Sequence, residues 1–209
     1  MILKALRFLG QHGVGASGRY AYFRLRNAYC RWRLIRSGVS VGRDVWFDGL
    51  VEVRIRAGGS ITVADRCNFG KYVHLKVGGG GHIVIERNVK INRFCIVEAH
   101  SRVTIEHDVL TAPYVHIVDA DHNFTSDRPV KEADIACGTL ARPVVIGAHA
   151  WLGSGVKVLA GTTIGAHTVV GANAVVTRDV PAYAVAAGVP CRVLKYRTEA
   201  PMPELTGSR

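Results

Sequence analysis

IGAHAWLGSGVKVLAGTTIGAHTVVGANAVV, residues 146–176, repeats one pattern every six residues. Each repeat opens with an aliphatic residue, and these openings are Ile146, Leu152, Val158, Ile164, Val170 and Val176. A small or β-branched residue stands four places after each opening, and glycine directly follows four of them. Neither the helix period of 3.6 nor the strand period of 2 produces this spacing. Six residues instead suit one flat side plus a corner, so three repeats predict a triangular coil with aliphatic residues inside and glycine at corners that need positive φ.

The same pattern continues upstream with small insertions. Aliphatic openings at Val41, Val63, Ile85 and Ile105 are separated by 22, 22 and 20 residues. We expect about 18 residues in a regular coil, so these steps indicate coils with a bulged corner. The sequence predicts an all-β fold, a parallel β-helix of about seven coils between Val39 and Pro190. Stacking supplies the stability of such a rod, and its ends need caps.

Two segments break the six-residue step. Within residues 19–36, Ala21, Leu25, Ala28, Trp32 and Ile35 follow the spacing of one helical stripe, with arginines on both sides. Residues 123–142 contain several Asp and Pro residues and predict a long loop that leaves the rod, and loops of this length are usually functional. The expected organisation is a basic helical arm at 1–38, a β-helix domain at 39–190 and a C-terminal tail at 191–209.

Charge is concentrated at the N-terminus. The chain carries a net charge of +11, and residues 1–43 contain nine basic residues and no acidic one. The other residues carry 18 basic and 16 acidic side chains and no recognisable nucleic-acid module, which disfavours a nucleic-acid partner. No run approaches the roughly 20 apolar residues that span a bilayer, and Met1–Leu9 makes a poor signal peptide, so a cytoplasmic chain is expected. Five cysteines without CxxC spacing predict free, mostly buried thiols.

Two stretches resemble the hexapeptide-repeat acyltransferases, in particular the galactoside, maltose and capsular-polysaccharide O-acetyltransferases. They are VHIVDADHNF at 115–124 and PVVIGAHAWLGSGVKVLAGTTIGAHTVVGANAVVTRDVPAYAVAAGVPCRVLK at 143–195. With the weaker upstream coils the resemblance covers about three quarters of the chain and leaves out the first 38 residues. It implies a left-handed β-helix and a homotrimer with active sites between neighbouring rods. It also implies transfer of acetyl from acetyl-CoA to a saccharide hydroxyl, in the synthesis of exopolysaccharide, capsule or lipopolysaccharide.

His122 aligns with the catalytic histidine of that family. Imidazole suits a general base at neutral pH, and the alternative for His122 is a loop-capping role. Asp119 and Asp121 could orient its ring, or could be solvated turn carboxylates. Asn92 falls where the resembling enzymes hold the acceptor, and its alternative is a corner asparagine in the left-handed conformation.

The resemblance also implies a binding surface for acetyl-CoA. Trp151 would form one wall of the tunnel that holds the pantetheine arm of acetyl-CoA, and Ser154 and Ala172 would line that tunnel. The nucleotide end would meet four later residues, where positive charge suits phosphates: Thr177, Arg178, Arg192 and Lys195. The alternatives are packing in a narrow coil for the small residues and a solvated C-terminus for the basic ones.

Several alternatives remain open on the sequence. Related carbonic anhydrases bind zinc through histidines, but the relation of His116 to His122 and the absence of their Gly-His pattern favour no metal. An N-acyltransferase for an amino-sugar nucleotide, a serine acetyltransferase and a non-catalytic rod are the other candidate functions. For residues 1–36 the alternatives are a cap on the first coil and peripheral contact with an anionic membrane surface, and both roles are compatible.

Overall fold

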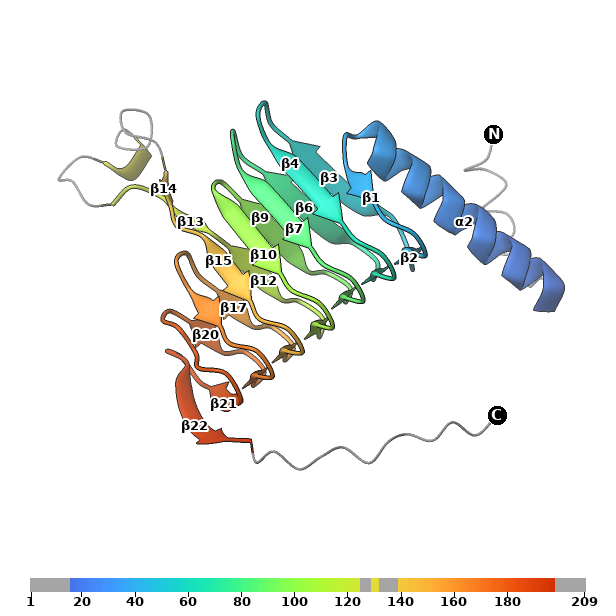
Figure 1. Cartoon of the computed structure of the whole chain (residues 1–209). Coiled ribbons are helices and arrows are strands. Elements are labelled where there is room, and N and C mark those ends of the chain that lie inside the picture. The colour runs from blue at the N-terminus through green and yellow to red at the C-terminus, as the bar shows by residue number, and fades with distance from the viewer. Residues whose placement is uncertain (1–15, 125–128, 132–138, 198–209) are drawn as a thin grey trace.

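The computed structural model describes residues 16–124, 129–131 and 139–197, and it shows a β-solenoid of stacked parallel strands (Figure 1). The aliphatic openings that lie 22, 22 and 20 residues apart in the sequence occupy neighbouring strands. Val41 pairs with Val63, Val63 with Ile85 and Ile85 with Ile105, and the ladder continues to Ile146 and Ile164. The predicted β-helix and its repeat register are therefore confirmed.

Three sheets form the sides of the coil. Sheet 1 contains β1 (Ser40–Val41), β4 (Ser60–Val63), β7 (His82–Ile85), β10 (Arg102–Ile105), β15 (Val144–Ile146) and β18 (Thr163–Ile164). Sheet 2 contains β2 (Trp46–Phe47), β5 (Asn68–Phe69), β8 (Lys90–Ile91), β11 (Leu110–Thr111), β16 (Trp151–Leu152), β19 (Val169–Val170), β21 (Ala184–Ala187) and β22 (Arg192–Tyr196). Sheet 3 contains β3 (Val51–Ile55), β6 (Val73–Val77), β9 (Ile96–Ala99), β12 (His116–Val118), β17 (Lys157–Val158) and β20 (Val175–Val176). We name the corners by the sheets that they join: 1–2, 2–3 and 3–1.

The rod has six complete coils and part of a seventh, where the sequence predicted about seven. Sheets 1 and 3 hold six strands each. In the last coil, Val180 forms a parallel bridge with Ile164 of sheet 1, and β21 adds a last parallel strand to sheet 2. After β21 the chain reverses, and β22 pairs with β21 in the antiparallel direction. This reversal ends the parallel stack at the C-terminal end.

The core consists of the inward-facing residue of each repeat. All six aliphatic openings from Ile146 to Val176 are buried, as are Val63, Ile85 and Ile105 upstream, whereas Val41 in the first coil is partly buried. Phe47 and Phe69 stack inside the first two coils, with ring centroids 5.6 Å apart. Strands such as β6 and β7 alternate buried and outward side chains, as a sheet with one face on the core requires.

The glycines that follow the aliphatic openings have a different role from the one expected. Positive φ at the corners belongs mostly to other residues, such as His149, His167 and Asn173. An added Cβ on Gly147 would lie 2.6 Å from the backbone nitrogen of Ala166 in the next coil. The repeat therefore needs glycine because adjacent coils approach closely there.

Helix α2 (Ala16–Arg36) covers the first coil, but with another face than the predicted stripe. Cys30 and Leu34 are buried, while Leu25, Trp32 and Ile35 are 55%, 54% and 50% exposed. The predicted stripe thus points away from the rod, and the cap prediction holds only for the helix as a whole.

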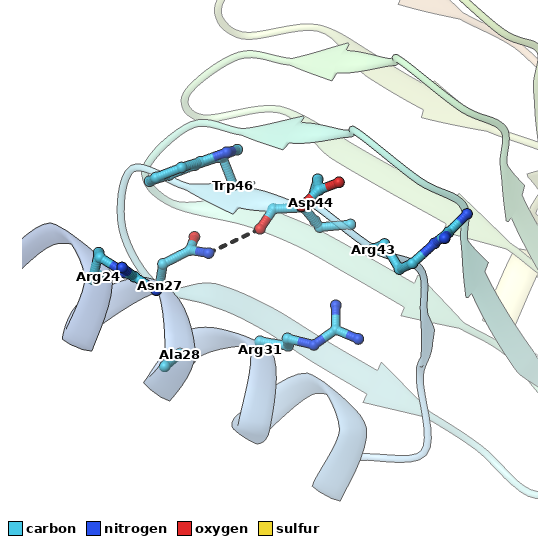
Figure 2. Close-up of a pocket in the computed structure, with 8 residues that line it drawn as sticks. Arg24, Asn27, Ala28, Arg31, Arg43, Asp44 and Trp46 are labelled. Carbon is cyan, nitrogen blue, oxygen red and sulfur yellow. Dashed lines mark hydrogen bonds between the residues drawn. The ribbon is translucent and has the colours of Figure 1, made fainter.

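Hydrogen bonds explain which face covers the coil. Within the described residues no strand precedes the first coil to pair its backbone, and polar side chains of α2 take that place. Asn27 donates from Nδ2 to the Val45 carbonyl at 3.0 Å (Figure 2) and accepts from the Phe47 amide at 2.8 Å. Arg31 donates to the carbonyls of Val41 and Gly42. An apolar stripe could not satisfy these groups.

The cysteines behave as predicted where the structure describes them. Cys30, Cys67, Cys95 and Cys191 are free and buried, whereas Cys137 lies outside the described residues. Burial raises the pKa of Cys67 to about 11. Within the described part of the chain, no helix is long and apolar enough to cross a membrane.

Replacing Gly147 by alanine should destabilise the rod by about 1–3 kcal/mol, because the added methyl meets the backbone of the next coil. Denaturant unfolding measures the change. Gly79→Ala is the matched control, since a Cβ there lies 3.8 Å from its nearest neighbour and should change stability by less than about 0.5 kcal/mol. Equal unfolding midpoints for the two variants would contradict the close-approach explanation.

Candidate functional site

An excursion from the rod follows the fourth strand of sheet 3, β12. Two short antiparallel strands, β13 (Ala120–Asp121) and β14 (Leu140–Ala141), form its stem and project from the coil (Figure 1). The predicted loop 123–142 corresponds to this excursion, although 125–128 and 132–138 lie outside the described residues. His122 directly follows β13, and its side chain is exposed.

Asp119 fixes the point where the excursion leaves the rod. Its side chain is fully buried, and its two carboxylate oxygens accept the amides of His100 at 2.7 Å and Ser101 at 2.8 Å. Both amides belong to corner 3–1 of the preceding coil. Asp119 therefore stabilises that corner through charge-assisted hydrogen bonds. An orienting role toward His122 stays a prediction.

Asp121 lies on β13 and pairs with Arg142, which follows β14. Its carboxylate lies 3.6 Å from the guanidinium of Arg142, and both side chains border a pocket of about 500 Å³ with Phe124 and Thr139. The Arg142 amide also donates to the Asp119 carbonyl at 2.7 Å. Sequence reasoning missed Arg142, although its place directly before the restart of the repeat at 143 was a usable signal.

Asn92 lies at corner 2–3, directly after β8. Its amide donates to Thr111 Oγ1 at 3.1 Å, and its Oδ1 accepts the Arg93 amide at 2.8 Å. Its φ is not positive, whereas Asn88 and Phe94 of the same coil do have positive φ. The left-handed corner alternative for Asn92 is therefore wrong.

Ser154, Ala172 and Trp151 lie along the same edge of the rod as Asn92. Ser154 and Ala172 occupy corner 2–3 two and three coils beyond Asn92, and Ser154 Oγ donates to the Pro113 carbonyl at 3.0 Å. Trp151 stands on the outer face of sheet 2, beside Leu110 and Val169, and is 48% exposed. Small residues at the corner and an exposed indole beside it could contact an extended ligand.

Of the remaining predicted residues, Thr177 and Arg178 lie apart from this edge, whereas Arg192 pairs with Ala187 beside Gly171 of corner 2–3. Thr177 and Arg178 are exposed after β20, at corner 3–1. Arg192 and Lys195 are exposed on β22, at the C-terminal end of sheet 2. Within one chain, Thr177 and Arg178 therefore lie at a different corner from Ser154.

His122 and Asn92 also lie at different corners. Strands β9 and β12 of sheet 3 pair in register, with Ile96 beside His116. Asn92 lies before the start of β9, and His122 lies beyond the end of β12. The length of sheet 3 therefore separates the two residues within one chain.

The zinc alternative named His116 and His122, and neither belongs to a described group of three side chains close enough to share an ion. Among the described residues, the side chains close enough to share an ion are His107, Asp108 and His149, at corner 1–2. Asp108 already accepts from Asn88 and pairs with His107 Nδ1 at 2.8 Å. His116 stands on the outer face of β12, with Nε2 buried and unbonded within the described residues, and burial lowers its pKa.

Comparison with known proteins agrees with this architecture. A family model described as bacterial transferase hexapeptide (six repeats) matches residues 143–178. WbbJ of Escherichia coli (strain K12), provisionally assigned as a lipopolysaccharide biosynthesis O-acetyl transferase, is 39% identical over 145 residues. That alignment covers 68% of this chain and 74% of WbbJ.

Solved structures share the fold. A galactoside acetyltransferase in complex with coenzyme A superposes with a TM-score of 0.52 at 25% identity, covering 92% of this chain and 78% of that one. A single-residue mutant of AntD, an N-acyltransferase from Bacillus cereus, superposes with a TM-score of 0.66 at 16% identity, covering 80% and 89%. The second likeness concerns the fold alone. From the repeat ladder, the hexapeptide match and the extent of the similarity to WbbJ, the chain belongs to the hexapeptide-repeat family of acyltransferases.

Proposed function

We propose that this protein transfers an acetyl group from acetyl-CoA to a saccharide hydroxyl, in the synthesis of exopolysaccharide, capsule or lipopolysaccharide. The observation that carries the proposal is the excursion at β13 and β14, which presents His122 where the repeat is interrupted. Similarity to WbbJ and the galactoside acetyltransferase supports the reaction class and the type of acceptor.

His122 is the proposed general base. A sugar hydroxyl is a weak nucleophile, so a base must take its proton as the oxygen attacks the thioester carbonyl. The carbon–sulfur bond then breaks, and the proton passes to the thiolate that leaves. Imidazole can accept and return a proton at neutral pH, which suits both steps.

Corner 2–3 supplies the proposed donor surface. Trp151 offers an exposed apolar face for the pantetheine, and Ser154 and Ala172 keep the corner narrow. Arg178, Arg192 and Lys195 are exposed cations near the C-terminal end of the rod, where they could meet phosphate groups of coenzyme A. Thr177 precedes this cluster and could add a hydroxyl contact.

A homotrimer would complete the site. Within one chain, sheet 3 separates His122 from Asn92, and corner 2–3 faces away from the excursion. If rods pack side by side around a threefold axis, corner 3–1 of one chain can meet corner 2–3 of its neighbour. His122 would then come from one subunit, and Asn92, Ser154 and Ala172 from the next.

The outward face of α2 is the proposed membrane contact. Leu25, Trp32 and Ile35 are about half exposed on the face opposite Cys30 and Leu34. The Arg36 guanidinium lies 5.6 Å from the Trp32 ring, so a cation adjoins the apolar surface. This arrangement suits a helix lying in the interface of an anionic membrane.

Substituting His122 tests the proposed mechanism. With acetyl-CoA and a panel of neutral saccharides and amino sugars, His122→Ala should lower acceptor-dependent thiol release about 10²- to 10⁴-fold. His82→Ala is the matched control, because His82 is a half-buried histidine on the outside of sheet 1 and should leave the rate unchanged. Equal rates for His122→Ala and the wild type would overturn the mechanism.

Flotation with liposomes tests the membrane contact. The wild type should float with vesicles that contain anionic lipid and less with neutral vesicles, since each basic residue near the surface adds about 1 kcal/mol. The double variant Leu25→Ser/Trp32→Ser should lose flotation, whereas Leu194→Ser, at a site on β22 that is 67% exposed, should keep it. Failure of the wild type to float at any salt concentration would remove the proposal.

A further inference from the structure

A second pocket lies where helix α2 overhangs corner 2–3 of the first three coils. Its volume is about 320 Å³, and it is lined by Phe23, Arg26, Asp48, Gly70, Lys71, Asn92 and Arg93. Phe23 and Arg26 come from the helix, and the others come from three successive coils. The helical arm therefore reaches the residue that is expected to hold the acceptor.

The pocket has a strong positive charge. Arg26, Lys71 and Arg93 bring three cations, and Asp48 is the single carboxylate in the lining. Two positive charges remain after that carboxylate is counted. A phosphate monoester carries about −1.5 to −2 at neutral pH, so its charge matches the pocket better than the single charge of a carboxylate.

Donors in this pocket are available for a ligand. Within the described residues, the side chains of Lys71 and Arg93 make no hydrogen bond or ion pair, and the Nδ2 group of Asn92 donates none. The larger groove on the other side of the helix, about 470 Å³, is different (Figure 2). There Arg31 donates to backbone carbonyls, and Arg43 pairs with Asp65 at 3.0 Å.

Arg26 is held in position at the wall of the pocket. Its Nη2 donates to the Phe47 carbonyl at 2.8 Å, and its guanidinium carbon lies 5.0 Å from the Phe23 ring centroid. Its Nε is buried and has no acceptor among the described residues. A cation fixed in this way needs little reorganisation to bind an anion.

The coil side of the pocket is also rigid. Tyr72, Phe94 and Tyr114 stack in a column along corner 2–3, with centroids 5.1 and 5.0 Å apart. Tyr72 directly follows Lys71, and Phe94 directly follows Arg93. Pairing of β5 with β8 sets the separation of Lys71 and Arg93 at one coil step, and the Phe94 amide donates to the Lys71 carbonyl at 2.9 Å.

We infer that this pocket binds a phosphate or diphosphate group carried by the saccharide acceptor, with Arg26, Lys71 and Arg93 as donors. The inference deepens the proposed function and rests on it for the identity of the acceptor. Ser154 lies two coils further along the same corner, about 10 Å at the spacing of neighbouring strands. A sugar ring attached to the phosphate would thus extend from the pocket past Asn92 toward the acetyl donor.

Calorimetric titration of the full chain tests the pocket without any need for catalysis. Glucose 1-phosphate, glucuronic acid and glucose serve as the phosphate, carboxylate and neutral probes. Glucose 1-phosphate should bind most tightly, and Lys71→Gln and Arg93→Gln should each weaken it about tenfold. Arg87→Gln, exposed at corner 1–2 of the same coil as Arg93, should bind like the wild type.

Two further ligands show whether the phosphate belongs to a nucleotide-linked or a lipid-linked acceptor. The acetyl-transfer assay separates this inference from the proposed function. Binding of UDP-glucose that depends on Lys71 supports a nucleotide-linked acceptor, and the same dependence for a polyprenyl diphosphate sugar in detergent supports a lipid-linked one. Equal affinity of the wild type for glucose 1-phosphate and glucose would contradict phosphate binding in this pocket. Equal affinity of Arg87→Gln and Arg93→Gln for glucose 1-phosphate would contradict it as well. If the wild type transferred acetyl to none of the saccharides but still bound glucose 1-phosphate, the proposed function alone would be overturned.

Discussion

Direct stacking of one coil on the next is the constraint on which this structure depends. Every strand of a coil pairs with the strand one turn away, so aliphatic residues must repeat at the same depth in each turn. Where adjacent turns touch most closely, only glycine fits, as at Gly147. The same pairing leaves unsatisfied backbone groups at the first coil, and Asn27 and Arg31 satisfy them from the helix.

Flat stacked sheets offer little concave surface, and two of the candidate functional features lie where the stack is interrupted. The excursion at β13 and β14 brings His122 out of the rod, and Asp119 fixes its point of departure through two backbone amides. At the other interruption, α2 meets corner 2–3 and encloses a basic pocket beside Asn92. Both features lie on the sides of the rod that a neighbouring chain could approach.

The sequence predicts the repeat ladder well because the register is local and periodic, and Val41 does pair with Val63 as its spacing implies. It predicts the wrong face of the helix. Apolar periodicity identifies a stripe such as Leu25 and Trp32, but an open coil end needs hydrogen-bonding groups first. The basic pocket escapes prediction as well, since it joins Arg26 to Arg93 across 67 positions that no motif relates.

Assembly of the active site from two chains is the central claim, and complementation between inactive variants tests it most directly. His122→Ala and Asn92→Ala chains would be unfolded together, refolded at equal concentrations and assayed for acetyl transfer. Random mixing in a trimer leaves both residues intact in about a quarter of the clefts, so the mixture should recover roughly a quarter of the wild-type rate. Activity no higher than that of either variant alone would contradict a site shared between subunits.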